Sequence, residues 1–450
     1  MNRSNSKRPS GMLGFTIVWI GQIISTLASS MSQFALTIFM FEETGSALAM
    51  GTMQVFFITP FLLISPLAGV WVDRYNRKMM MMVSDIGAGV ATILIMILQA
   101  FGVLEYWHIY GASIIYGLSM AFQWPAYSAA ISTMIPKAQL GRVNGMMSLI
   151  EAGPQVIAPL LAGALLPVIA LTGILALDVV SFLFAVGALL FVHIPQPVPT
   201  EAGMRSQNEG IFRDAIYGFK YIFSRPSLLG LQIIFLFGNL FSGIGFAVLA
   251  PMILTRSGGD SLAFGTVQSA AAIAAVVGSV TMSVSGGFKR RVHGVLIGWI
   301  LSGIGMAIVG FTGGLMVWIA GLALTAFVSP FVSASNQAIW QAKVSPDLQG
   351  RVFSARRLIA WMTNPISPLI GGALADFALE PAAVAGTGLP HVFSGLVGTG
   401  AGSGMGLLIV FVGVAAALVG VVGYFSRRVR NAEILLPDYE PPLKMAEIGG

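Results

Sequence analysis

Long apolar runs constrain this chain more than any other feature of its sequence. A helix that crosses a lipid bilayer needs about 20 apolar residues, whereas the strands of a membrane β-barrel would show about 10 residues of alternating polarity. The continuous runs in this sequence of 450 residues fit helices. We therefore predict an all-α membrane protein. Its twelve predicted transmembrane helices cover 13–40, 48–71, 79–101, 107–133, 144–170, 172–193, 228–254, 263–287, 294–312, 315–340, 354–376 and 403–425.

The chain carries too few charges to form a water-exposed surface. Only 9% of its residues are Asp, Glu, Lys or Arg, and 56% are hydrophobic, whereas a typical soluble domain has about 25% charged residues. The sequence contains no cysteine, which excludes disulfides and thiolate metal sites. It also shows no phosphate-binding loop, metal-ligand cluster or nucleophile–base pair. We therefore expect a protein that is not an enzyme and binds neither a cofactor nor a metal.

Basic residues gather in alternate loops. If the N-terminus is inside, all of the 24 Lys and Arg residues except Arg256 fall in segments on the inner side. The cytoplasmic loops of membrane proteins carry such an excess of basic residues. We therefore expect a multi-pass protein of the plasma (inner) membrane with both termini in the cytoplasm. The net charge of +6 then reflects topology, and we expect no nucleic-acid partner.

The middle of the chain interrupts the apolar pattern. The segment IPQPVPTEAGMRSQNEG (194–210) is polar and contains prolines, as linkers do. It precedes IFRDAIYGFKYIF (211–223), whose apolar residues fall on one face of a helix. Such a helix lies in the membrane interface, either as a tether or as a regulatory element. The predicted units are an N-terminal six-helix half (1–193), a cytoplasmic linker with this helix (194–227), a C-terminal six-helix half (228–425) and a cytoplasmic tail (426–450).

The two halves share a repeat at an offset of 209 residues. GRV at 141–143 aligns with GRV at 350–352, and PLLAGAL at 159–165 aligns with PLIGGAL at 368–374. Both pairs of blocks fall on the same inner loop and following span of each half. The sequence therefore predicts a parallel repeat about an axis along the membrane normal.

A charged loop joins the second and third spans. The stretch GVWVDRYNRK begins at Gly69 and places Asp73, Arg74, Arg77 and Lys78 at fixed positions. It resembles motif A of the major facilitator superfamily, G-x-L-a-D-R-x-G-R-K. The resemblance implies the major facilitator fold, with a gating loop at these residues.

Two positions depart from motif A, and other segments indicate a branch of the family. Trp71 replaces the usual Leu, and Asn76 replaces a Gly; Asn is tolerated at left-handed turn positions. FALTIFMFEETGSALAMG (34–51) and LDVVSFLF (177–184) resemble the branch that contains macrolide efflux proteins and the enterobactin exporter. This resemblance implies multidrug efflux, hence antibiotic resistance, driven by a proton gradient.

The family resemblance also implies a central substrate cavity. Amides and aromatic rings on the expected lining spans suit a large, mostly apolar solute with a few hydrogen-bonding groups. The alternative is that these amides only bond neighbouring helices to one another. The candidate cavity residues are Gln33, Tyr116, Gln123, Trp124, Asn239, Asn336, Gln337, Trp340, Trp361 and Asn364.

By the same resemblance, the charged loop approaches the inner end of span eleven when the inner side is closed. The exposed N–H groups of that helix end carry a partial positive charge, which Arg351, Arg356 and Arg357 reinforce. Asp73 would then act as a latch against this inner gate of the second half. Alternatively, Asp73 only caps its own turn.

Three intramembrane carboxylates are candidates for proton coupling, because a charge inside a bilayer is costly and usually functional. Glu151 is the first candidate, since it lies roughly 10 Å deep at about 1.5 Å per residue and precedes Gly153 and Pro154. Asp85 is the second, although it is also placed to pair with a loop Arg or Lys. Asp178 is the third and lies near the outer end of span six.

The expected function is secondary active export of amphiphilic small molecules by proton antiport and alternating access, by a monomer in the lipid bilayer. One alternative is an exporter of an endogenous siderophore or lipid-like metabolite. Another is a non-transporting membrane receptor or scaffold, because a fold does not determine its function.

Overall fold

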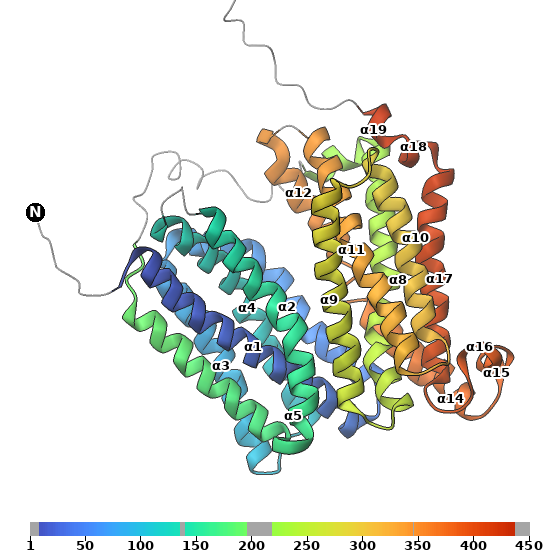
Figure 1. Cartoon of the computed structure of the whole chain (residues 1–450), viewed down its shortest axis with the longest axis horizontal. Coiled ribbons are helices and arrows are strands. Elements are labelled where there is room, and N and C mark those ends of the chain that lie inside the picture. The colour runs from blue at the N-terminus through green and yellow to red at the C-terminus, as the bar shows by residue number, and fades with distance from the viewer. Residues whose placement is uncertain (1–8, 136–139, 196–217, 345, 437–450) are drawn as a thin grey trace, which may run out of the picture.

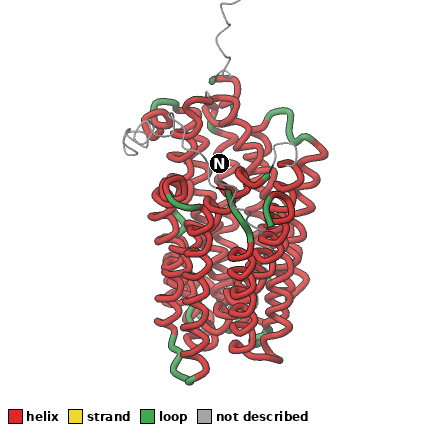
Figure 2. Tube along the Cα trace, turned by 90° about the vertical axis from the view of Figure 1, so that its left-hand side faces the viewer, coloured by secondary structure: helices red, strands yellow, loops and turns green. Residues whose placement is uncertain are grey.

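The computed structural model describes residues 9–135, 140–195, 218–344 and 346–436, and these form helices joined by loops without a β-strand (Figures 1 and 2). The N-terminal helices are α1 (Gly11–Thr44), α2 (Ala47–Arg74), α3 (Arg77–Ala100), α4 (Tyr106–Met134) and α5 (Leu140–Phe191). The C-terminal helices are α8 (Pro226–Arg256), α9 (Ser261–Ser285), α10 (Arg291–Gly310), α11 (Leu315–Lys343), α12 (Pro346–Trp361), α13 (Ser367–Leu374), the π-helix η2 (Ala375–Leu379), α14 (Glu380–Val384), α15 (Gly388–Val392), α16 (Ser394–Val397), α17 (Ser403–Phe425), α18 (Arg427–Arg430) and α19 (Ala432–Leu435).

Nine helices of the described chain are long and apolar enough to cross a membrane. They are α1, α2 (over Ala47–Ser65), α3, α5 (over Gly153–Phe191), α8, α9, α10, α11 and α17. The prediction of an all-α membrane protein is therefore confirmed. The exact count of twelve spans stays a prediction.

The helix α5 accounts for part of the difference in number. Its 52 residues would extend about 78 Å at about 1.5 Å per residue, which far exceeds a hydrocarbon core of about 30 Å. Ala170 has φ 55° and ψ 179°, so the helix is interrupted there. Figure 1 shows that α5 doubles back on itself, so that it consists of two limbs. These limbs correspond to the predicted fifth and sixth spans.

The predicted eleventh span, 354–376, is interrupted rather than one continuous helix. The helix α12 ends at Trp361, and α13 begins at Ser367. Pro365 lies between them and has no N–H with which to continue the helical hydrogen bonds. The carbonyl of Ala360, near this break, accepts a hydrogen bond from Asn239 Nδ2 of α8 at 3.0 Å. A side chain of a neighbouring helix thus satisfies a backbone group beside the interruption.

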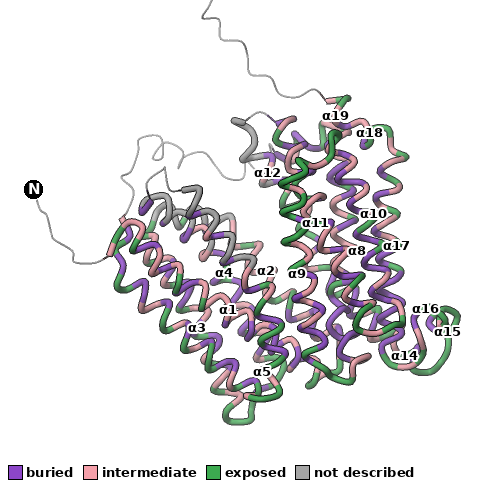
Figure 3. Tube along the Cα trace, viewed as in Figure 1, coloured by how far each residue is buried: buried purple, intermediate pink, exposed green. Residues whose placement is uncertain are grey.

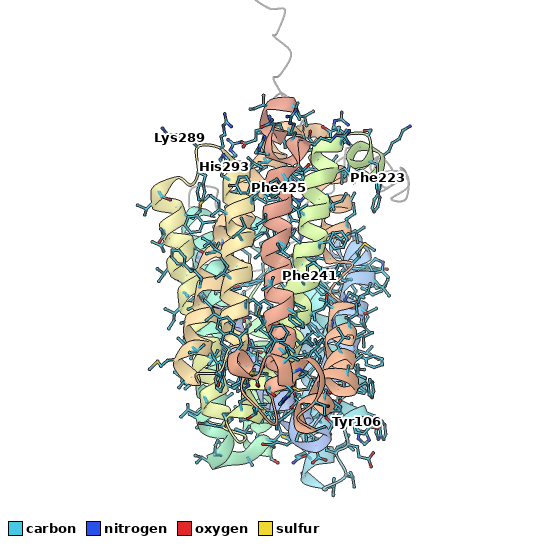
Figure 4. The ribbon with its side chains drawn as sticks, turned by 90° about the vertical axis from the view of Figure 1, so that its right-hand side faces the viewer. Tyr106, Phe223, Phe241, Lys289, His293 and Phe425 are labelled. Carbon is cyan, nitrogen blue, oxygen red and sulfur yellow. The ribbon has the colours of Figure 1, made fainter. Side chains whose placement is uncertain are left out.

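The helix ends and loops define two opposite faces of the molecule. The helix α1 begins and α19 ends at one end, which we call the terminal face, and the loops after α1, α3 and α8 lie at the other end, the opposite face (Figure 1). Figure 4 shows Lys289 and Phe425 at the terminal face and Tyr106 at the opposite face.

The apolar cores show how the N-terminal and C-terminal helices are joined. One buried cluster draws on both groups, and within it Phe34 of α1 stacks on Phe264 of α9 with ring centroids 4.9 Å apart. Nearer the terminal face each group has its own core, around Phe15 in the N-terminal group and around Trp299 in the C-terminal group. Figures 1 and 3 show the two groups meeting toward the opposite face and diverging toward the terminal face. The described state therefore opens toward the terminal face.

The repeated sequence blocks lie where the two groups meet. Pro159 begins the first block on α5, and a Cβ added to Gly265 of α9 would lie 2.3 Å from its carbonyl oxygen. Pro368 begins the second block on α13, and a Cβ added to Gly51 of α2 would lie 2.6 Å from its carbonyl oxygen. Small residues allow helix backbones to approach this closely in membranes. The two blocks therefore make equivalent contacts, α5 with α9 and α2 with α13.

A carboxylate from the C-terminal group completes this junction. Asp376 on η2 accepts hydrogen bonds from the hydroxyl of Ser46 at 2.5 Å and from the backbone N–H groups of Ala47 and Leu48 at 3.1 and 2.9 Å. These donors form the N-terminus of α2, where a negative charge is favourable. One group thus caps a helix of the other at the opposite face.

The linker between the groups is described only at its end. Of the amphipathic helix predicted over 211–223, residues up to 217 lie outside the described chain, and from 218 the chain is helical. Ile222 is fully buried with Leu228 and Trp340. This end of the segment therefore packs against the C-terminal group. The predicted unit boundaries and the tail 426–450 stay predictions.

Substitution Gly265→Ala should disfavour the state that is closed at the opposite face. The added methyl group would meet a backbone oxygen, and overpacking of this kind costs about 1–3 kcal/mol, which is roughly a tenfold change in the ratio of two states. Because the sequence has no cysteine, spin labels can be placed uniquely at Tyr75 and Lys289 on the terminal face. Electron–electron distance measurements should then show a shorter distance between the labels.

Gly187→Ala is the matched control, because an added Cβ there meets no atom within 4 Å. An unchanged distance distribution for Gly265→Ala would show that this contact does not hold the opposite face closed.

Candidate functional site

Asp85 lies in a buried cluster of amides near the terminal end of α3. Its carboxylate accepts hydrogen bonds from Gln22 Nε2 of α1 at 3.0 Å and from Gln123 Nε2 of α4 at 2.8 Å. Gln123 Nε2 also donates to Gln22 Oε1 at 2.7 Å. The expected partner of Asp85, a loop Arg or Lys, is not what the structure shows. The carboxylate is held by neutral donors from two neighbouring helices.

Asp178 lies in a second cluster, on the limb of α5 that follows Ala170. It accepts hydrogen bonds from Ser29 Oγ of α1 at 2.8 Å and from Thr92 Oγ1 of α3 at 3.1 Å. The hydroxyl of Tyr116 bonds in turn to that of Thr92. Its place near the outer end of the span suggested that water at the outer interface would solvate the carboxylate. Asp178 is only 2% exposed, so water does not stabilise its charge. Hydrogen bonds from hydroxyl groups stabilise the carboxylate instead.

Both carboxylates lack a basic partner among the described side chains. A carboxylate inside a membrane protein is costly and marks a functional position by default. Hydroxyls donate or accept as required, and an amide does both through different atoms. Each cluster is therefore suited to a carboxyl group that gains and loses a proton.

The spacing of polar residues along α1 and α3 could have indicated the hydrogen-bond partners of the two carboxylates. Gln22 and Ser29 are seven residues apart on α1, and Asp85 and Thr92 are seven residues apart on α3. Residues at this spacing share a face of a helix. The periodicity brings the polar positions of α1 and α3 to the same seam, although the sequence does not tell which helices are neighbours.

A cavity of about 580 Å³ lies in the C-terminal group between α8, α11 and α12. Aromatic rings, amides and guanidinium groups form its wall. Its lining residues are Gln232, Phe235, Asn239, Ser333, Ala334, Asn336, Gln337, Phe353, Arg356, Arg357, Ala360 and Trp361.

Two arginines of the expected inner gate belong to this cavity. Arg356 donates from Nη2 to Gln337 Oε1 at 2.6 Å, and its guanidinium carbon lies 5.2 Å from the ring centre of Phe353. The guanidinium carbon of Arg357 lies 5.9 Å from the ring centre of Trp361. The side chain of the third, Arg351, lies outside the described part.

The structure places the predicted cavity residues in several different surroundings. Asn239, Asn336, Gln337 and Trp361 line the cavity of the C-terminal group. Trp340 is fully buried and donates from Nε1 to Asn336 Oδ1 at 3.0 Å, so it belongs to the core behind the wall. Tyr116 and Gln123 belong to the carboxylate clusters, Gln33 and Asn364 are partly buried outside this cavity, and the side chain of Trp124 is not described.

The loop that resembles motif A is described in part. Gly69 and the side chains of Asp73, Arg74 and Glu151 lie outside the described part, so the roles assigned to them stay predictions. Lys78 Nζ donates to the carbonyls of Leu190 and Val192 at 3.2 and 2.8 Å, near the C-terminal end of α5. A cation at a helix C-terminus is favourable. Arg77 begins α3 beside it.

Asn76 does not occupy the left-handed position that we expected. It has φ −62° and ψ 116°, and its side chain accepts a hydrogen bond from the N–H of Met79 at 3.2 Å. Asn76 is therefore the N-cap of α3, a role for which Asn is among the preferred residues.

Comparison with known proteins identifies similar transporters. The sequence profile of the Major Facilitator Superfamily matches residues 18–368. Macrolide efflux protein A of Streptococcus pyogenes is 24% identical over 369 residues, which cover 81% of this chain and 90% of that protein. Multidrug efflux pump Tap of Mycolicibacterium fortuitum is 23% identical over 363 residues, which cover 79% and 88%.

Solved structures show the same fold at low sequence identity. A bacterial homologue of the human lysosomal transporter Spinster, in an inward-facing and unoccupied conformation, has a TM-score of 0.69 at 16% identity and covers 96% of this chain and 100% of that chain. A bacterial homologue of the iron transporter ferroportin, in an inward-facing state, has a TM-score of 0.62 at 16% identity and covers 91% and 98%.

The two carboxylate clusters should respond differently to neutralisation. In Asp178→Asn the hydroxyls of Ser29 and Thr92 can rotate to accept from the new amide, whereas in Asp85→Asn one buried amide group loses its partner. An unsatisfied buried group costs about 1–3 kcal/mol. Asp85→Asn should therefore lower the free energy of unfolding in mixed micelles by about that much more than Asp178→Asn does. Equal losses would show that the amide cluster rearranges as freely as the hydroxyls.

Proposed function

The chain belongs to the major facilitator superfamily, and we propose that it is a secondary active exporter of amphiphilic small molecules that exchanges substrate for protons by alternating access. The proposal of proton exchange rests on one observation: two buried carboxylates, Asp85 and Asp178, accept hydrogen bonds from neutral donors. The relatives named as macrolide and multidrug efflux proteins support export as the direction of transport. A receptor or scaffold would need neither carboxylate.

The arrangement of the cores supports alternating access. A core shared by both groups at the opposite face and separate cores near the terminal face describe a state open to one side only. Transport requires a second state in which the terminal face closes and the opposite face opens. Because packed interfaces switch between discrete arrangements, the junction made by the two repeat blocks is the contact that must give way.

The cavity of the C-terminal group suits an amphiphilic solute. Pockets of about 300–1,000 Å³ accommodate drug-sized molecules, with mainly apolar walls and a few polar groups that set orientation. The cavity volume of about 580 Å³ lies within that range, and its wall combines Phe235 and Trp361 with Asn239 and Gln337. Trp361 also stacks on Phe61 of α2, with ring centroids 6.4 Å apart. An occupant would therefore sit beside the other helix group.

Of the two buried carboxylates, Asp85 is the better placed for exchange with the open side. It is 9% exposed, whereas Asp178 is 2% exposed, and Asp85 lies eight positions from the start of α3 at the terminal face. Protonation would weaken its bonds to the two glutamines, which come from different helices. The proton would thus change how α1, α3 and α4 pack.

We propose that the terminal face is cytoplasmic. Among the described residues, its loops and helix ends carry Arg77, Lys78, Lys289, Arg290 and Arg427, as expected of cytoplasmic loops. In the complementary state, in which the terminal face closes, Asp73 would approach the start of α12, where Arg356 and Arg357 follow. The contact in which Asp73 acts as a latch would therefore form only when the terminal face is closed.

Asp85→Asn should abolish uphill, proton-driven efflux while leaving downhill exchange of substrate. The test uses inverted membrane vesicles that carry a proton gradient and a fluorescent amphiphilic dye, with a protonophore added to collapse the gradient. The accumulation ratio should fall by about tenfold, because the coupling between proton and substrate, typically worth about 5–150-fold, is lost.

Glu105→Gln is the control, since this carboxylate is exposed at the opposite face. Asp178→Asn and Glu151→Gln are measured alongside. Loss of coupling in Glu151→Gln alone would assign the role to the carboxylate that the sequence favours. Normal coupling in all three variants would refute proton antiport through these groups.

The proposed orientation has its own test. Gly388 begins α15 at the opposite face, and Arg430 ends α18 at the terminal face (Figure 1). A reporter fused after Arg430 should be active in the cytoplasm, and one inserted at Gly388 should be active outside. A cytoplasmic signal at Gly388 would reverse the orientation.

A further inference from the structure

The charges of the cavity in the C-terminal group have one sign. Two guanidinium groups, those of Arg356 and Arg357, line it, and no Asp or Glu is among its described lining residues. The buried carboxylates Asp85 and Asp178 belong to the N-terminal group. A cavity wall with two cations and no anion favours a ligand that carries negative charge.

Arg356 is only partly satisfied by the protein. Its Nη2 donates to Gln337 Oε1 at 2.6 Å, while its Nη1 is buried without a hydrogen-bond partner. A guanidinium presents its donors as a planar fork, which matches the two oxygens of a carboxylate or phosphate. One arm of this fork is thus held in place, and the other has no acceptor among the described residues.

The described carboxylates of the C-terminal group are engaged elsewhere. Asp260 caps the N-terminus of α9, and Asp376 caps α2. Glu380 accepts from the N–H groups of Gly402 and Met405 at the start of α17. Glu433 accepts from the N–H of Val292 at 3.0 Å. None of these carboxylates neutralises the two arginines.

We propose that this cavity binds the oxyanionic group, a carboxylate or a phosphate, of an amphiphilic molecule. The proposal rests on the proposed function and names the substrate class. The Arg356 guanidinium, whose Nη1 has no protein acceptor, binds the oxyanion, and Arg357 adds charge beside Trp361. The rings of Phe235 and Phe353 contact the apolar body. The amide of Gln337, which accepts from Arg356, holds the guanidinium in this orientation and is a positioning residue.

The test measures equilibrium binding of two probes that differ in one charge, cholate and its methyl ester. The full chain is placed in nanodiscs of phosphatidylcholine, and empty nanodiscs correct for partition into lipid. The wild-type protein should bind cholate with a Kd about tenfold lower than that of the ester, because charged hydrogen bonds are roughly twice as strong as neutral ones.

Variants of the two arginines then assign the preference. Arg357→Gln, at an exposed position that leaves the Gln337 contact intact, should reduce the preference for cholate severalfold. Arg356→Gln should abolish it, and Arg356→Lys should restore part of it. Lys289→Gln removes an equal charge at the same face outside the cavity (Figure 4) and should leave the preference unchanged.

Three results would overturn the proposal: equal affinity for the two probes, no binding of either, or an equal loss in Lys289→Gln and Arg357→Gln. Binding is measured without a proton gradient, so it is separate from the vesicle test of efflux. Anion-selective binding without uphill efflux would support this site and refute the proposed function. Efflux of the ester with no binding preference for cholate would support the proposed function and refute this site.

Two further measurements distinguish the source of the oxyanion. Inorganic phosphate that displaces cholate would identify a site for the anionic group alone. Displacement in nanodiscs that contain phosphatidylglycerol would identify a lipid headgroup as the occupant. Either result supports the oxyanion site, and insensitivity to both, with the cholate preference intact, assigns it to a carboxylate amphiphile.

Discussion

The need to satisfy every backbone polar group away from water governs this structure. In lipid only helices satisfy their N–H and C=O groups within a single segment, so each place where a helix is interrupted needs a partner. Asn239 supplies one beside the break between α12 and α13. Arg256 supplies several at the opposite face, where its guanidinium donates to the carbonyls of Gly310, Phe311, Val397 and Gly402. Arg256, which the sequence pattern sets apart from the other basic residues, thus serves the backbone.

The two helix groups divide the charges between them. The N-terminal group buries two carboxylates among amides and hydroxyls, and the C-terminal group presents two guanidinium groups to a cavity. The groups meet at the opposite face through proline–glycine contacts and a shared apolar core. In a protein of this family, such a division would let a proton act on one group and a substrate on the other, with the junction between them transmitting the change. This coupling is the mechanism that we propose.

Much of the fold could be predicted from the sequence because lipid imposes long apolar runs. The predicted span 403–425 coincides with α17, and 48–71 differs from α2 by a few residues. The repeat blocks at 159–165 and 368–374 were visible as sequence, but their role as the contact between groups was not. The candidate site was predicted only in its residue types. Asn239 and Gln337 line the cavity, whereas Trp340 is packed behind it.

The sequence by itself determined the helical membrane architecture, the charged loop and the gathering of basic residues in alternate loops, because these depend on local composition and on the thickness of the bilayer. Only the tertiary structure decided the partners. Asp85 meets Gln22 across 63 positions and Gln123 across 38 positions of the chain, and no local pattern specifies which helices become neighbours. The same holds for Arg356, whose free donor is a property of the wall that surrounds it. Packing decides which polar side chains bond to one another and which are left for a ligand.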